Sequence, residues 1–319
     1  MQCYRLINKI GYVFVKSKNK FKKITAIILS AMIAVGSLTV APYSALALAS
    51  VSEEVSASSG ITGNCSWSLD SEGILTISGS GAMEDYSENN QAPWGNTIRK
   101  VIIENGVTDI GSFSFRQSEQ LTEAVIPKSM KTIGNRAFYK CTALNSVSIP
   151  EGMTKIGEYA FYRCYGLTKI DIPGTMTSIG SSAFAYCSGL KDIVISKGIA
   201  AIDSFVFYGT APEKLTIPKS VKSIGNSTFA ACEQLSSVSF PNGLQIIESG
   251  AFYNCPKLKK VIVSGSVSSI GNKAFGYFNP ETYPQYGSSG KFSDFDIGGY
   301  FKHTMLSRCF FQADSMIMT

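Results

Sequence analysis

An internal repeat of about 23 residues limits what this chain can fold into more than any other feature of its sequence. An isoleucine followed by glycine, aspartate or glutamate recurs eight times at intervals of 22 or 23 residues, and a phenylalanine stands five residues after each. The isoleucines are Ile110, Ile133, Ile156, Ile179, Ile202, Ile224, Ile247 and Ile270, and the phenylalanines are Phe115, Phe138, Phe161, Phe184, Phe207, Phe229, Phe252 and Phe275. Such a short unit cannot bury its apolar residues alone, so neighbouring units must stack around a continuous core. The sequence therefore predicts a solenoid.

Each unit also carries a pattern typical of one short strand. Val147 and Ile149 are two residues apart and alternate with serines, so they share one face of an extended segment. Pro150 ends the strand, Gly157 permits a tight turn, and Phe161 continues the buried set. We expect one short parallel β-strand per repeat, with turns or short helical segments on the other side of the solenoid.

The unit IGNRAFYKCTALNSVSIPEGMTK resembles the leucine-rich repeats of the Bacteroides surface protein A type, also called Treponema-type repeats, over about Ile98 to Phe275. The preceding stretch, GNCSWSLDSEGILTISGSGAM, resembles the β-rich lead-in module found ahead of such repeats. The resemblance implies a curved solenoid at the bacterial cell surface, often an adhesin for host matrix proteins, mucosal surfaces or other bacteria. It brings no catalytic residues with it.

Four segments are expected: a signal peptide over residues 1–49, a lead-in or N-terminal cap over 50–97, the solenoid over 98–278, and an irregular tail over 279–319. The first has a basic start ending at Lys22 and Lys23, an apolar run, and small-x-small cleavage sites after Ala47 or Ala49. An uncleaved membrane anchor is the alternative, although the apolar run is short for a span. The tail is interpreted as a cap, a degenerate ending or the remnant of a longer parent.

The formal charge of +6 does not indicate nucleic-acid binding, because the basic excess lies in the predicted signal peptide. Residues 1–49 hold seven basic residues and no acidic one, which leaves 22 basic against 23 acidic residues in the rest. We therefore expect a secreted or cell-surface protein with no nucleic-acid partner and no stable membrane span after cleavage.

The side chains that alternate with the buried strand residues form two outward columns, which we call the sheet face. The first column is Lys100, Glu123, Ser146, Lys169, Asp192, Lys214, Ser237 and Lys260, and the second is Ile102, Val125, Ser148, Asp171, Val194, Thr216, Ser239 and Ile262. Exposed apolar groups in a rigid array suit protein recognition, so these residues are the candidate ligand face. The alternative is that they are ordinary β-forming residues, or that the face is covered.

Tyrosines form a second candidate surface. Tyr139, Tyr162, Tyr208 and Tyr253 directly follow the repeat phenylalanine, and Tyr186 lies one residue further along its own repeat. Tyrosine is enriched where proteins meet partners, and its ring can also stack on sugars. The alternative is that these rings seal the convex side of the core.

No cofactor, metal site or catalytic group is expected. Five cysteines (Cys141, Cys164, Cys187, Cys232 and Cys255) occupy one repeat position, which favours a column of buried thiols over disulfides between neighbouring repeats. The only histidine, His303, lies in the irregular tail, away from any catalytic motif.

The predicted function is therefore not enzymatic. We expect a secreted or cell-surface adhesion protein that presents its repeats to a host or bacterial protein ligand. The alternative is a carbohydrate- or cell-wall-binding module, which the tyrosine column and the lead-in residues Trp67 and Trp94 suggest.

Overall fold

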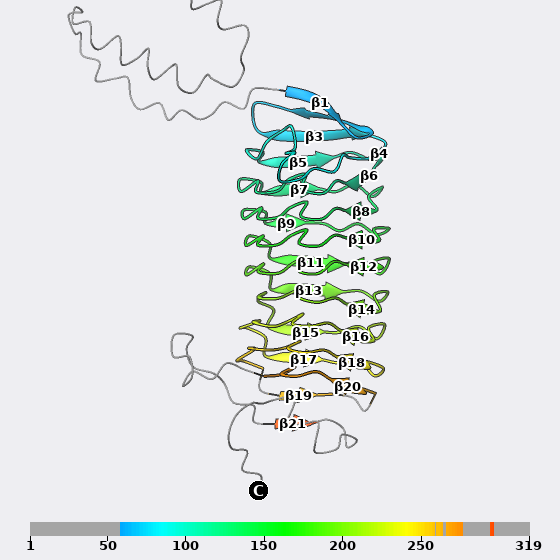
Figure 1. Ribbon diagram of the computed structural model, residues 1–319, viewed down its shortest axis with the longest axis vertical. Helices are drawn as coiled ribbons and strands as arrows, with labels where there is room; N and C mark the ends of the chain where they lie inside the picture. Colours follow the sequence, from blue (N-terminus) through cyan, green and yellow to red (C-terminus); the bar gives the residue numbers. More distant parts are fainter. Residues whose placement is uncertain (1–57, 259, 264–265, 277–293, 297–319) are drawn as a thin grey trace, which may run out of the picture. The chain divides into compact units, whose positions relative to one another are not determined.

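The computed structural model describes residues 58–258, 260–263, 266–276 and 294–296, which form a parallel β-solenoid of about eight turns (Figure 1). The predicted signal peptide and His303 lie outside these residues. The described part of the chain contains no helix, so turns, and not helical segments, complete each rung. It therefore also holds no helix long and apolar enough to cross a membrane.

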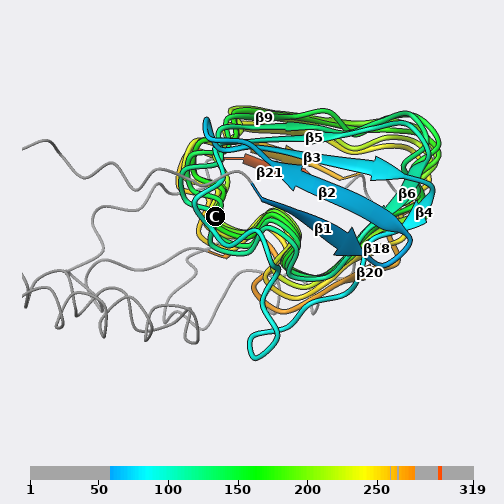
Figure 2. The same ribbon diagram turned by 90° about the horizontal axis from the view of Figure 1, so that it is seen from above.

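Each rung contributes two strands, and the second was not predicted. The strands of the sheet face are β3 (Ile74–Gly79), β5 (Lys100–Ile103), β7 (Glu123–Val125), β9 (Ser146–Val147), β11 (Lys169–Ile172), β13 (Asp192–Ile195), β15 (Lys214–Thr216), β17 (Ser237–Ser239) and β19 (Lys260–Ile262). The second series is β4 (Gly81–Ala82), β6 (Val107–Ile110), β8 (Thr132–Ile133), β10 (Lys155–Ile156), β12 (Ser178–Ile179), β14 (Ala201–Ile202), β16 (Ser223–Ile224), β18 (Ile246–Ile247) and β20 (Ser269–Ile270). Seen along the stack, the two series occupy adjoining sides of the rung (Figure 2).

The rungs stack in register because equivalent residues pair across neighbouring strands. Lys169 pairs with Asp192 and Ile170 with Ile193 in the parallel β11–β13 ladder. Parallel strands lie about 4.8 Å apart, so each repeat residue forms a column along the stack. Side chains that alternate along one strand therefore become either a buried or an exposed column.

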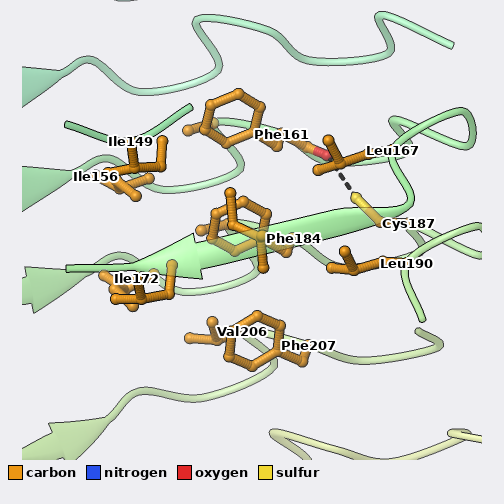
Figure 3. Packing of buried hydrophobic residues seen from close by; sticks show 14 of the residues in the cluster. Ile149, Ile156, Phe161, Leu167, Ile172, Phe184, Cys187, Leu190, Val206 and Phe207 are labelled. Carbon is orange, nitrogen blue, oxygen red and sulfur yellow. Dashed lines mark hydrogen bonds between the residues drawn. The ribbon is translucent and has the colours of Figure 1, made fainter. Parts of the chain in front are cut away.

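The repeat phenylalanines form the centre of the core. All eight are fully buried. The rings of Phe161 and Phe184 are stacked with centroids 5.1 Å apart and planes 2° from parallel, and Phe184 stacks on Phe207 at 5.5 Å (Figure 3). Leucine, isoleucine and valine columns surround the rings, as Leu167 and Leu190 show. The predicted core residues are thus confirmed.

Gly157 is required by close approach between rungs rather than by the tight turn that the sequence suggested. A Cβ on Gly157 would lie 2.6 Å from the backbone N of Asn135 and from the carbonyl carbon of Gly134. Gly134, Gly180, Gly225 and Gly271 face equally close backbone atoms of the rung before them. These glycines are therefore needed because they lack a side chain, and not because they can adopt a left-handed φ.

The N-terminal end of the core is closed by β1 (Ser58–Thr62) and β2 (Cys65–Leu69). These strands pair antiparallel with each other, and β2 pairs antiparallel with β3. They run across the end of the stack (Figure 2). β3 and β4, which lie within the predicted lead-in, already pair parallel with β5 and β6, so they have the geometry of a rung.

The tail contributes one strand that the sequence did not reveal. β21 (Asp294–Asp296) pairs parallel with β19, with Lys260 opposite Asp294 and Ile262 opposite Asp296. The parallel ladder of the sheet face therefore continues past the last recognisable repeat.

Candidate functional site

The sheet face presents the two predicted columns as an exposed array. The predicted residues from Val125 to Thr216 are exposed side chains on or next to β7 to β15, and so are Ser237, Ser239 and Ile262. The apolar members Val125, Val194 and Ile262 expose 39%, 45% and 56% of their surface. Lys100, Ile102 and Glu123, at the N-terminal end, are half-buried. The described residues thus do not cover this face.

Charged groups on the sheet face are partly paired with one another. The Lys100 ammonium lies 2.9 Å from the Glu123 carboxylate across two strands, and Lys169 lies 3.2 Å from Asp171 on its own strand. Asp192 stands opposite Lys169 in the register. Because the Lys169 and Asp171 side chains are more than half exposed, this pair orders the surface more than it stabilises the fold.

A shallow depression of about 500 Å³ lies in the middle of the sheet face. Six predicted face residues line it: Glu123, Val125, Ser146, Ser148, Lys169 and Asp171. It lies where β9 shortens to two residues, and within the described strands no ladder joins β9 to β11. The depression therefore places an apolar group, hydroxyls and both signs of charge around one concave surface.

The predicted tyrosines lie on the side of the rung that carries the phenylalanine turn. The rings of Tyr139 and Tyr162 are stacked at 5.1 Å, and Tyr162 meets the edge of Tyr186 at 5.5 Å. Tyr186 then contacts Tyr208 at 5.0 Å. Tyr253 is half-buried, and Ala230 takes the tyrosine position in the rung between it and Tyr208. The structure thus joins the first three predicted tyrosines through Tyr186.

Burial raises the pKa of Tyr162 and of Tyr208 above the ordinary tyrosine value. These phenols are therefore neutral at physiological pH. Tyr139, Tyr162 and Tyr208 are half-buried, and the column reaches the surface at Tyr186, which is 40% exposed.

Cationic side chains on the same turns were missed by the sequence analysis. The guanidinium of Arg136 lies 5.4 Å from the ring centroid of Phe113 and 5.2 Å from that of Tyr159. Arg163 lies 5.3 Å from Tyr162 and 5.4 Å from Tyr186. Such distances are those of cation–π contacts. No motif signals these arginines, because Phe113, Tyr159 and Tyr186 lie one rung away from them, and only Tyr162 is a sequence neighbour.

The two tryptophans of the lead-in do not offer a sugar platform, so this part of the carbohydrate prediction is wrong. Trp67 and Trp94 are only 7% and 3% exposed. Trp94 packs on Phe115, with centroids 5.8 Å apart, and its Nε1–H donates to the Ser114 carbonyl at 2.9 Å. Both rings belong to the end of the core.

The repeat cysteines form the predicted column of buried thiols. All five, together with Cys65, are free and buried. Each repeat thiol donates to the carbonyl of the phenylalanine in the preceding rung, as Cys187 does to Phe161 at 3.0 Å. Within the described ranges, no cluster of three or more histidine, cysteine, aspartate or glutamate side chains is arranged to hold a metal ion.

Comparison with solved structures finds several bacterial leucine-rich repeat proteins. A leucine-rich repeat protein from Eubacterium ventriosum is 24% identical, with a TM-score of 0.49, over 69% of this chain and 70% of its own. A leucine-rich cell surface protein from Faecalibacterium prausnitzii is 24% identical, with a TM-score of 0.49, over 76% of each chain. The pneumococcal vaccine antigen PcpA is 18% identical, with a TM-score of 0.37, over 69% of this chain and 79% of its own. No curated protein sequence matches.

The family assignment rests on the repeats themselves. The model of the BspA type leucine-rich repeat region matches in six copies over residues 94–210 and 154–281, more than half of the chain. Solenoids of this kind present extended surfaces for binding, and nothing in the described residues indicates catalysis. The chain belongs to the BspA type leucine-rich repeat family.

Proposed function

We propose that this chain is an extracellular adhesion protein whose sheet face binds a protein ligand. The observation that carries the proposal is the depression between β7 and β11, where Val125 lies beside the charged pair Lys169–Asp171. Protein interfaces combine a desolvated apolar centre with a polar, charged rim. A rigid parallel sheet supplies such an array with little ordering cost on binding.

The predicted export signal on residues 1–49 supports an extracellular location. Its basic start, apolar run and cleavage sites are the three parts of a secretory signal. Cell fractionation, combined with N-terminal sequencing of the mature protein, tests this part of the proposal. A mature N-terminus at Leu48 or Ser50 is expected, and a full-length protein retained in the cytoplasm would contradict it.

The binding test uses the purified protein on an array of collagen, fibronectin, fibrinogen, mucin and peptidoglycan. We expect saturable binding to at least one protein spot. The variant Val194→Lys places a charge in the centre of the face, opposite Asp171 in the register, where the fold tolerates it. The same change at Ile246, which is 39% exposed on the second strand series, is the matched control.

We expect Val194→Lys to weaken binding by about tenfold or more, because it desolvates a charge at the interface, while Ile246→Lys leaves binding unchanged. Equal effects of the two variants would show that the sheet face is not the binding surface. If the unmodified protein bound to no protein spot, this result would count against the adhesin function.

A carbohydrate- or cell-wall-binding function is the second candidate. The lead-in tryptophans no longer favour it, but the joined tyrosines Tyr139, Tyr162 and Tyr186 do, because they reach the surface. Binding to peptidoglycan or mucin glycans in the absence of binding to any protein would favour this function over the first.

A further inference from the structure

A continuous chain of aromatic and cationic side chains runs along the phenylalanine turns, and we call it the turn-face ladder. It consists of Phe113, Arg136, Tyr159, Tyr162, Arg163 and Tyr186, which contact one another in that order. The Tyr159 and Tyr162 rings meet edge to face at 5.5 Å, which joins the two cation–π units. The ladder thus crosses four successive rungs.

The backbone holds these side chains in fixed positions. Phe113, Arg136, Tyr159, Arg163 and Tyr186 all have left-handed φ angles, between 55° and 60° for most of them and 53° for Arg136. Their backbone N–H groups donate to the next rung, as Arg136 does to the Glu158 carbonyl at 2.9 Å and Arg163 to that of Ala185 at 2.9 Å. This hydrogen bonding fixes the direction of each side chain from the rung outward.

Left-handed φ favours glycine, and glycine does stand at two equivalent places, Gly209 and Gly250. Serine, alanine, glutamine, asparagine and lysine stand at the equivalent places in other turns, so the left-handed turn is a property of the repeat and accepts many side chains. Over the rungs of the ladder, these positions hold mainly aromatic and cationic side chains.

The cations of the ladder have unused binding capacity. Lys140 lies beside the ladder, with its ammonium 5.4 Å from the ring centroid of Tyr139. Among the residues that the structure describes, no carboxylate lies within ion-pair distance of Arg136, Lys140 or Arg163. Arg116, one rung before Arg136, differs from these cations, because its guanidinium is paired with the Glu88 carboxylate at 3.1 Å. A stacked guanidinium keeps its N–H edge free to bind a carboxylate or sulfate in a bidentate manner.

A small polar pocket lies at the N-terminal end of the ladder. It holds about 100 Å³ and is lined by Phe113, Arg116 and Gln117 together with Gln91 and Asn96 of the β4–β5 loop. Amide and guanidinium groups there can bind hydroxyl or acidic groups. The ladder and the pocket form one continuous polar and aromatic surface along the stack.

We propose that the turn-face ladder binds an anionic polysaccharide whose chain runs along the solenoid axis. The exposed ring of Tyr186 stacks on a sugar face, while Arg136, Lys140 and Arg163 bind carboxylate or sulfate groups. Arg136 and Lys140 lie on one rung and Arg163 lies on the next, about 4.8 Å along the stack, so the free cations suit a glycan that carries charged groups on neighbouring sugars.

A nucleic acid fits this surface less well. Duplex DNA carries one charge per about 1.7 Å of axis, far denser than the cations of the ladder. The rings of Tyr139 and Tyr162 are stacked on each other at 5.1 Å, which leaves no space for a base between them. The chain beyond residue 49 also has no basic excess to attract a polyanion from a distance.

The test measures binding of the purified protein to immobilised heparin, hyaluronate, polygalacturonate, uncharged dextran and a single-stranded DNA oligonucleotide. We expect binding to at least one charged glycan, weakening with salt, and none to dextran. Comparing the affinity for heparin with the affinities for hyaluronate and polygalacturonate distinguishes recognition of sulfate from recognition of carboxylate. Tighter binding to DNA than to every glycan, or no binding to any charged glycan, would overturn the proposal.

The double variant Arg136→Gln and Arg163→Gln removes both stacked cations and leaves the left-handed backbone no more strained than before. We expect it to lower glycan affinity by about tenfold or more, because charge-assisted hydrogen bonds are lost. The matched control is Lys155→Gln with Lys219→Gln, two exposed cations that belong neither to the ladder nor to the sheet face. An equal loss in the control would indicate non-specific attraction and reject the ladder as the site.

Two further variants separate this proposal from the sheet-face function. Tyr186→Ser removes a ring without changing charge, and it should also weaken glycan binding. Val194→Lys on the sheet face should leave glycan binding unchanged, and the arginine variants should leave protein binding unchanged. Thermal melting of each variant controls for the fold. Retained glycan affinity in Tyr186→Ser would show that the ring does not contribute.

Discussion

The Sγ of Cys187 lies 3.0 Å from the carbonyl oxygen of Phe161, one rung earlier, so the thiol donates a hydrogen bond along the axis of the stack (Figure 3). The same link recurs at the other four repeat cysteines, at 3.0 to 3.6 Å. It gives the phenylalanine carbonyl a second donor inside the core, since the Phe161 oxygen also accepts from the backbone N–H of Cys164 at 3.2 Å.

Native protein is expected to leave Cys141 and Cys164 unmodified by iodoacetamide, even under oxidising conditions. Burial raises the pKa of Cys141 and of Cys164, and the thiolate is the reactive form. Mass spectrometry of peptides after labelling checks this, with urea-unfolded protein as the positive control. Rapid labelling of the native protein, or the loss of two hydrogen masses from a cross-linked pair of these peptides, would contradict it.

The raised pKa of Cys141 and Cys164 also makes the stability of the fold depend on pH. A folded-state pKa above the unfolded value means that the native state binds these protons more tightly, so the contribution is complete below the unfolded thiol pKa of about 8.5 and is lost as the pH rises further. The urea midpoint should therefore fall above that pH. Cys164→Ala should show a shallower fall than the parent, and an identical slope in both would contradict this origin.

Ser118→Ala is expected to stabilise the protein by about 1 kcal/mol. Ser118 stands at the cysteine position of the first repeat, and its buried hydroxyl has no hydrogen-bond partner. Removing an unsatisfied buried hydroxyl removes its desolvation cost. Urea unfolding monitored by circular dichroism measures the change.

Thr210→Ala is the matched control, because Thr210 stands at the same position in another rung and its hydroxyl donates to the Phe207 carbonyl at 2.8 Å. Here the free energy of unfolding should fall by about 1–2 kcal/mol. If the two substitutions changed stability in the same direction, hydrogen bonding would not be what separates these positions.

Gly157→Ala is expected to destabilise the fold by about 1–3 kcal/mol, because the added methyl would lie 2.6 Å from the backbone of the preceding rung. Asp203→Ala, at the equivalent place in a rung that already carries a side chain there, should change stability by less than about 0.5 kcal/mol. Thermal melts of both variants test this, and a harmless Gly157→Ala would show that the rungs can separate at little cost.

The regular part of the fold could be predicted because its causes are local and repeated. Val147 and Ile149 alternate with polar neighbours, and this alone assigns the buried and exposed sides of the strand. The second strand series escaped prediction because a two-residue strand such as Lys155–Ile156 is too short to show alternation. It exists only because the rung before and the rung after pair with it.

The candidate sites also differ in whether local sequence or the stacking of rungs determines them. Sheet-face residues such as Lys169 follow from alternation, whereas the contacts of Arg136 with Tyr159 and of Arg163 with Tyr186 form only when rungs stack. Their turns also lack the glycine that marks a left-handed position, so no turn signal was present. Trp94 suggested carbohydrate binding, yet it packs on Phe115, the first ring of the phenylalanine column.

That role of Trp94 leads to a prediction about local stability. Its ring packs at 31° to Phe115, meets the edges of Trp67 and Tyr86 at 5.8 and 5.5 Å, and donates to the Ser114 carbonyl. Trp94→Ala should cost about 3–5 kcal/mol, typical of a large buried ring. Because a solenoid is stabilised mainly between neighbouring rungs, the loss should be greatest near the N-terminal end.

Amide hydrogen exchange, measured for each strand, tests this expectation. In Trp94→Ala, amides of β3 and β5 should exchange faster, while those of β15 and β17, several rungs away, should change little. Trp94→Phe keeps an aromatic ring against Phe115 but loses the indole donor, so it should recover most of the protection. Uniform loss of protection along the stack would mean that the described rungs unfold as one cooperative unit, and that Trp94 does more than close the end of the phenylalanine column.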